Sequence, residues 1–79
     1  MYQRTYVAVK AIFDENGVIR PRAILLRGHS YPIDRVMGCR QAAAMKAGGQ
    51  GMRYTVRIGS RETFLFLAED NRWFVEEKI

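Results

Sequence analysis

The stretch RYTVRIGSRETFLFLAEDNRWFVEEK, residues 53–78, shows the clearest strand pattern in the chain and decides its fold class. Tyr54, Val56 and Ile58 alternate with polar residues, and this period of two gives a half-buried strand one apolar face. Residues 63–68 (TFLFLA) are apolar on both faces, which is typical of an inner strand. The stretch therefore predicts two neighbouring strands, one of them covered on both sides.

A third strand is predicted at residues 72–77, where the alternation is less regular. The pairs Gly59-Ser60 and Asp70-Asn71 separate these three segments, and both pairs are residue types that tolerate tight hairpin turns. Short turns between successive strands place the strands side by side in opposite directions. The C-terminal part of the chain is therefore expected to be a three-stranded antiparallel meander.

Two strands are predicted at the start of the chain. Residues 6–13 (YVAVKAIF) alternate in the same way, and the Asn16-Gly17 pair that follows is a strong hairpin signal. The next strand is expected at about residues 18–26. Pro21 has no N–H to donate to a neighbouring strand, so this strand is predicted to lie at an edge or to contain a bulge.

The middle of the chain is less regular. Residues 31–36 (YPIDRV) predict a strand with a bulge, because the spacing of their apolar residues slips by one position. Residues 41–51 are rich in alanine and then in glycine. We expect them to form one long connection, with room for a short helical turn, because seven helix-favouring residues make a marginal helix.

Six antiparallel strands in 79 residues predict one all-β domain, residues 1–79. A small barrel or a curled meander, SH3-like or OB-like, is the expected architecture, because curling protects the strand edges. The predicted core consists of alternating apolar residues from all six segments: Val7, Val9, Phe13, Ile24, Tyr31, Ile33, Val36, Tyr54, Val56, Ile58, Phe64, Phe66, Trp73 and Val75.

The composition excludes several classes of protein. Apolar residues make up 48% and charged residues 27% of the chain, and no apolar run approaches the roughly 18 residues of a membrane span. We expect a cytoplasmic protein without a membrane partner, since the start of the chain also lacks the apolar core of a signal peptide. His29 and Cys39 are the only residues of their kinds, so no metal site, cofactor or catalytic constellation is expected.

The net charge of +5 is unevenly distributed along the chain. Residues 1–19 are balanced and residues 62–79 carry a net charge of −3. Residues 20–61 contain nine basic residues against Asp34 alone, a surplus of +8. A concentrated surplus of one sign on a small fold is typical of a protein that binds a polyanion.

The basic residues fall into sets that share strand faces. Arg53 and Arg57 project from one face of their strand, and Arg20 and Arg22 from one face of theirs. Arginines beside aromatic rings are how small β-barrels hold single-stranded nucleic acid, and Tyr2, Tyr6 and Tyr31 are the candidate rings. The predicted site for single-stranded DNA or RNA consists of Arg20, Arg22, Lys46, Arg53 and Arg57.

Two other interpretations remain open. The arginines could serve only to keep a small barrel soluble, with the tyrosines belonging to the core. The domain could instead be a protein-interaction or oligomerisation module, in which the strand containing Pro21 or the C-terminal strand pairs with another chain. A salt-dependent binding assay separates these interpretations from nucleic-acid binding.

The runs RGHSYPIDRV, RYTVRIG and RWFVEEKI resemble an uncharacterised family of small bacterial β domains with the pattern RGxxYxIDxV, RYxVRxG and RWFVE. Similar segments occur in tail domains of proteins related to Y-family DNA polymerases. The resemblance implies a compact β domain without catalytic residues and favours work on nucleic acid. The matching positions are Arg27, Gly28, Tyr31, Ile33, Asp34, Val36, Arg53, Tyr54, Val56, Arg57, Gly59, Arg72, Trp73, Phe74 and Val75.

Overall fold

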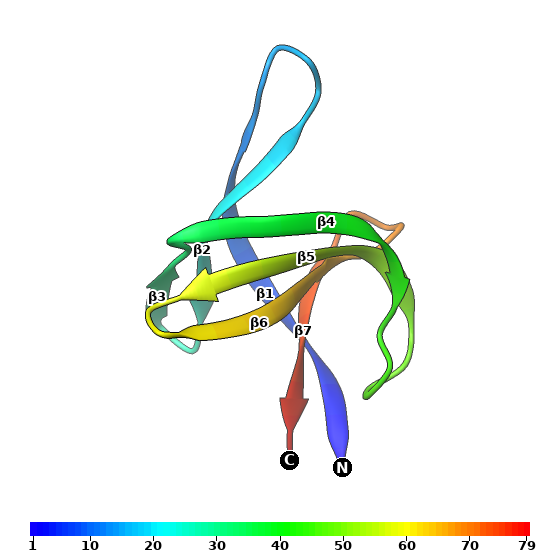
Figure 1. The fold of residues 1–79 in the computed structure, drawn as a ribbon. Helices are drawn as coiled ribbons and strands as arrows, with labels where there is room; N and C mark the ends of the chain where they lie inside the picture. The colour runs from blue at the N-terminus through cyan, green and yellow to red at the C-terminus, as the bar shows by residue number, and fades with distance from the viewer.

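The computed structural model describes all residues 1–79 and contains seven β-strands and no helix. The strands form one antiparallel sheet in the order β3-β2-β1-β7-β6-β5-β4, and the sheet curls into an open half-barrel (Figure 1). The predicted all-β class and the curled antiparallel arrangement are confirmed. The strands are β1 (Tyr2–Phe13), β2 (Ile19–Leu26), β3 (His29–Pro32), β4 (Arg35–Ala43), β5 (Gln50–Ile58), β6 (Arg61–Leu67) and β7 (Trp73–Lys78).

The strand predicted at residues 31–36 is two strands, so the count of six was wrong. The chain passes from β3 to β4 through Ile33 and Asp34, and these two residues bridge the two ends of the sheet. The N–H of Ile33 donates to the carbonyl of Arg22 on β2, and the N–H of Asp34 donates to the carbonyl of Arg57 on β5, each at 2.8 Å. The one-position slip in the apolar spacing of residues 31–36 coincides with this crossing from β3 to β4.

Residues 41–51 are not the long connection that was predicted. Strand β4 continues to Ala43 and β5 begins at Gln50, which leaves residues 44–49 as a turn. Ala42 pairs with Gly51 in the ladder between the two strands, so pairing with β5 overrides the helix propensity of the alanines. Strand propensity depends on a partner, which the local sequence does not reveal.

The first two strands form a hairpin that projects from the body of the sheet (Figure 1). Its turn is the predicted one, with Gly17 at a φ of +79° and the carboxylate of Asp14 accepting the N–H groups of Asn16 and Val18. The backbone hydrogen bond from Val18 is the main cause that lowers the pKa of Asp14. The register shifts beside Pro21, so the predicted bulge is confirmed.

The two strands predicted to offer free edges, β2 and β7, do so over only part of their length. Strand β2 lies between β1 and β3 but pairs with β3 only from Ala23, and β7 lies between β1 and β6 but pairs with β6 only through Trp73 and Phe74. The two end strands of the sheet are β3 and β4. The nine residues of β4 pair with β5 on one side and with no strand on the other.

Strand β1 holds the two halves of the sheet together. Residues Tyr2–Val7 pair with β7, and residues Ala8–Phe13 pair with β2. The first and last residues lie side by side, with the N–H of Ile79 donating to the carbonyl of Met1 at 3.0 Å (Figure 1). The strands of the two halves of the chain are therefore joined by backbone pairing along β1 and β7, by the Ile33–Asp34 crossing and by the packing of Ile24 into the concave core.

Both faces of the sheet carry an apolar cluster. On the concave face Ile24, Tyr54, Val56 and Leu65 are buried, and the partly buried Val7, Val9, Ile33, Ile58, Trp73 and Val75 pack around them. On the convex face Phe66 and Phe74 are buried with Ala44. The predicted core is therefore mostly confirmed, but the prediction missed Leu65 and Phe74, which have no exposed surface.

Four residues of the predicted core are exposed instead: Phe13 (70%), Tyr31 (40%), Val36 (38%) and Phe64 (40%). Phe13 lies in the projecting hairpin, where no further strand covers it. Tyr31 and Val36 lie on the end strands β3 and β4. The prediction for these residues was wrong because apolar alternation indicates a face of a strand but not whether another element covers that face.

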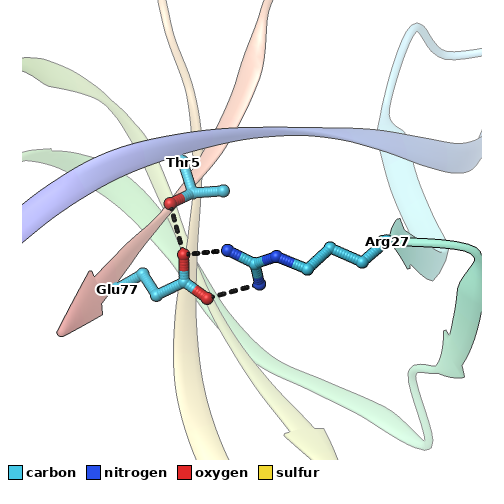
Figure 2. A network of polar contacts seen from close by, with 3 residues as sticks. All are labelled: Thr5, Arg27 and Glu77. Carbon is cyan, nitrogen blue, oxygen red and sulfur yellow. Dashed lines mark hydrogen bonds and ion pairs between the residues drawn. The ribbon is translucent and has the colours of Figure 1, made fainter. Parts of the chain in front are cut away.

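An ion pair fixes the β2–β3 turn to the joined strands β1 and β7. Arg27 donates two hydrogen bonds to Glu77, at 2.6 and 2.7 Å, and the hydroxyl of Thr5 donates to the same carboxylate at 2.8 Å (Figure 2). The bond from Arg27 is the largest cause that lowers the pKa of Glu77, to about 2. A bidentate pair of this kind sets the orientation of both elements.

The Glu77→Gln variant is expected to lose part of the acid sensitivity of the fold. A lowered pKa means that the ionised carboxylate adds stability above its ordinary pKa of 4.5, and that this stability is lost as the pH falls toward about 2. Urea denaturation between pH 5 and pH 2, read by Trp73 fluorescence, should show a shallower decline for the variant. Glu15→Gln, in the exposed β1–β2 turn, serves as the control, and an equal decline in all three proteins would contradict the prediction.

Gly51→Ala is expected to lower the free energy of unfolding by about 1–3 kcal/mol, the usual cost of overpacking. Gly51 is buried on β5, and a Cβ there would overlap the carbonyl of Leu67 on β6. Gly38→Ala is the matched control, because a Cβ at Gly38 meets no atom within 4 Å. Urea denaturation of the two variants measures the difference, and equal stabilities would show that β5 and β6 can separate without cost.

Candidate nucleic-acid interface

A row of directly opposed residues crosses five neighbouring strands on the convex face of the sheet. Arg40 of β4 pairs with Arg53 of β5, and Arg53 pairs in turn with Phe66 of β6. Phe66 pairs with Phe74 of β7, and Phe74 pairs with Tyr6 of β1. Because directly opposed residues point to the same face, the row places two arginines beside three aromatic rings.

A second pair of arginines lies on the same two strands. Arg35 of β4 is directly opposite Arg57 of β5. Like charges in directly opposed positions destabilise a sheet, so the two arginine pairs carry a cost that an anionic partner would relieve. Glu62 approaches Arg57 at 4.0 Å, but both side chains are about half exposed, so this ion pair is weak.

Cations lie over the aromatic rings of this face. The guanidinium carbon of Arg53 is 4.4 Å from the centre of the Phe64 ring, and that of Arg72 is 3.6 Å from the centre of the Tyr6 ring. Such contacts fix the guanidinium plane against a ring. The Nε of Arg53 is buried and has no hydrogen-bond partner. This unused donor is a further cost at the centre of the arginine set.

The middle rings of the row are covered, and the outer ones are accessible. Phe66 and Phe74 stack with centroids 5.0 Å apart and lie beneath Ala44 of the β4–β5 turn. Glu76 fixes this turn, since its carboxylate accepts the N–H groups of Lys46 and Ala47 at 2.6 and 2.7 Å. Two exposed rings, those of Phe64 and Tyr6, are left on either side of the covered pair.

Of the five predicted site residues, three lie on the convex side. Arg53 and Arg57 share the convex face of β5, as their spacing predicts. Lys46 lies in the β4–β5 turn and lines a hollow of about 290 Å³ together with Phe64. Its ammonium group is 4.9 Å from the centre of the Tyr2 ring. Arg53 and Lys46 therefore both lie near the exposed ring of Phe64, in a region where Glu62 and Glu76 also line the hollow.

Arg20 and Arg22 lie apart from the other three. They line a groove on the concave side, between β2 and β4, whose floor includes Tyr54. The curl of the sheet separates the two sets, so the five predicted residues do not form one patch. Of the three predicted rings, Tyr2 and Tyr6 lie near convex-face cations, whereas Tyr31 lies on β3 at the far end of the sheet.

The prediction omitted three residues of the convex site. Arg35 and Arg40 were counted in the charge surplus, but β4 was expected to end before Arg40, so their pairing with β5 was not foreseen. Phe64 was assigned to the core although it is exposed. The spacing of Arg53 and Arg57 along one strand was a usable signal. Any neighbouring strand that pairs with theirs must place residues directly opposite both arginines.

No family model, curated protein or solved structure matches this chain. The structure contains no helix long and apolar enough to cross a membrane. It also contains no group of three or more His, Cys, Asp or Glu side chains positioned to hold a metal ion. The geometry of the convex face is therefore the main basis for assigning a function.

Proposed function

We propose that the convex face binds single-stranded DNA or RNA weakly and with little sequence preference. One observation carries this proposal: two arginines of β4 lie directly opposite two arginines of β5, beside accessible aromatic rings. The opposed residues are Arg40 with Arg53 and Arg35 with Arg57. Phosphates between the arginines would offset the repulsion within each pair. The arginine pairs thus make an anion the expected partner of this face.

The rings make a single strand the expected form of that anion. Unpaired bases can stack on exposed rings and on guanidinium planes, and the face offers both at Phe64 with Arg53 and at Tyr6 with Arg72. The bases of a duplex are already stacked on one another, and this fold has no helix to enter a major groove. Phosphate contacts and stacking carry little sequence information, so the binding should tolerate many sequences.

A salt titration tests the proposal. Anisotropy of a fluorescent single-stranded oligonucleotide should show binding at low ionic strength, with a log-log salt slope of about −0.7 for each phosphate neutralised. Four arginines engaged with phosphates give a slope of about −2.8. A duplex of the same length should bind more weakly at equal salt. Absence of binding at the lowest salt, or an affinity that does not change with salt, would refute the proposal.

The alternative proposal is a protein-interaction module that uses a strand edge. The observation that favours it is the unpaired edge of β4, which is nine residues long and exposed along most of its length. An extended segment of another chain can add to such an edge through main-chain hydrogen bonds. The two proposals use different surfaces, so one domain could serve both.

A further inference from the structure

We propose that the groove between β4 and β2 accepts an extended, acidic segment of a partner protein, which adds to the free edge of β4 and narrows the opening of the half-barrel. The groove lies on the concave side, and of the four paired arginines only Arg35, at the start of β4, also lines it. This inference rests on the alternative proposal of a strand-edge module and extends it by naming the partner, and Arg20 and Arg22, which line only the groove, separate it from nucleic-acid binding.

The groove has the size and lining of a site for a peptide strand. Its volume is about 600 Å³, and its apolar lining includes Met52, Tyr54 and Leu67. The Tyr54 phenol is neutral at physiological pH at its ordinary pKa of 10.0, and burial with a contact to Cys39 raises that pKa further, to about 12. Alternate apolar side chains of an extended peptide would find an uncharged surface here.

Backbone without a strand neighbour lies on both sides of the groove, although the carbonyl of Arg22 accepts the N–H of Ile33. Strand β4 has no neighbour on its outer edge. On the opposite side β2 pairs with β3 only from Ala23 to Leu26, so the β2 residues before Ala23, which line the groove, have no strand beyond them. Long exposed edges are normally covered or blocked, and a peptide strand laid along β4 would cover one and face the other.

The charges around the groove select an acidic partner. Arg20, Arg22 and Arg35 line it, and Asp34 is the only acidic residue among the lining residues. Asp34 is already engaged, because its carboxylate accepts the N–H of Gly59 at 2.7 Å. Arg20 has only a long, exposed contact with Asp14, at 3.6 Å, which is worth little.

A second copy of this chain does not supply such a strand. The acidic residues that lie within strands are Glu62 on β6 and Glu76 and Glu77 on β7. Strand β7 pairs with β6 only through Trp73 and Phe74, but its two carboxylates are already engaged within the chain. Glu76 accepts the N–H groups of Lys46 and Ala47, and Glu77 is bound by Arg27. The free edge of β4 carries Arg35 and Arg40, which would bring like charge to the groove. The partner is therefore a different protein with an exposed acidic segment.

The test uses a nine-residue fluorescein-labelled peptide of alternating glutamate and valine, with anisotropy as the readout. We expect this peptide to bind, and two controls to bind at least about fivefold more weakly. One control replaces glutamate by lysine and reverses the charge. The other has proline at the centre, which removes a main-chain donor and blocks pairing with β4. Equal binding of either control, or no binding of the first peptide, would overturn the proposal.

Two double variants separate the groove from the convex face. Arg20→Ala with Arg22→Ala should weaken peptide binding and leave oligonucleotide binding unchanged, whereas Arg40→Ala with Arg57→Ala should affect mainly the oligonucleotide. Slower amide exchange in β4 on addition of the peptide would support strand addition. Sedimentation as a dimer with β4 amides already protected would overturn the proposal, because a second copy would then occupy the edge.

Discussion

Phe74→Ala is expected to lower the free energy of unfolding by about 3–5 kcal/mol, the usual cost of deleting a buried aromatic ring. Phe74 has no exposed surface, and its ring stacks on Phe66 with centroids 5.0 Å apart and meets the edge of Tyr6 at 5.9 Å. Small domains have only about 5–15 kcal/mol of stability in total. The variant should therefore unfold at a much lower urea concentration than the parent protein, measured by circular dichroism.

Phe64→Ala provides the matched control for this prediction. It removes the same ring from the same face of the sheet, but Phe64 is exposed and its main contacts are with Arg53 and Phe66. We expect a loss of about 1 kcal/mol or less. Equal losses in the two variants would show that the covered pair Phe66 and Phe74 is not the core of the convex face.

Arg40→Ala combined with Arg57→Ala is expected to weaken oligonucleotide binding about 25-fold at 0.1 M salt, if each arginine neutralises one phosphate. The same loss should reduce the log-log salt slope by about 1.4. The pair takes one arginine from each like-charged couple and leaves Arg53 over the Phe64 ring. Titrations at several salt concentrations measure both quantities.

Stability measurements make this variant more informative. Removing one member of each like-charged pair relieves repulsion, so the free energy of unfolding should stay constant or rise while binding falls. The control, Arg20→Ala with Arg22→Ala, removes the same total charge from the concave groove. If the control weakened oligonucleotide binding as strongly, the effect would come from net charge and not from the convex face.

The C-terminal meander could be predicted from sequence because its signals are local. Alternation over β5 and the apolar run of β6 each identify a strand without reference to the rest of the chain. The turns are also recognisable from the sequence, because glycine and asparagine tolerate positive φ values. In the structure Gly59 and Asn71 adopt φ values of 62° and 65°. Where strand, turn and strand are adjacent in sequence, pairing follows from the turn.

The middle of the chain could not be predicted in the same way. Ala42 and Ala43 are in a strand only because β5 offers them a ladder, and that partner lies beyond a turn whose glycines suggested a flexible loop. Likewise, the change from β3 to β4 depends on hydrogen bonds to two strands at opposite ends of the sheet. Such long-range contacts leave no periodic signal in the segment itself.

The candidate site was accessible to sequence reasoning one strand at a time. A spacing of two places Arg53 with Arg57 and, separately, Arg20 with Arg22. Whether these pairs meet depends on the sheet order and on its curl, because three strands, β1, β7 and β6, lie between β2 and β5. The charge surplus therefore indicated the sign of the charge on an expected partner. Only the structure shows that the basic residues are divided between two surfaces.

The pairing of β1 with β7 has a consequence for the order in which the chain can fold. Strand β1 is synthesised before the other six strands and β7 after them, and the contact from Thr5 to Glu77 spans 72 residues. Hairpins within β1–β3 and within β4–β7 can form as they emerge, but the two groups can be joined along β1 only after β7 has left the ribosome. Until then Tyr2–Val7 remains an unpaired edge. Closure of this pair late in folding, across a large loss of loop entropy, should set the folding rate.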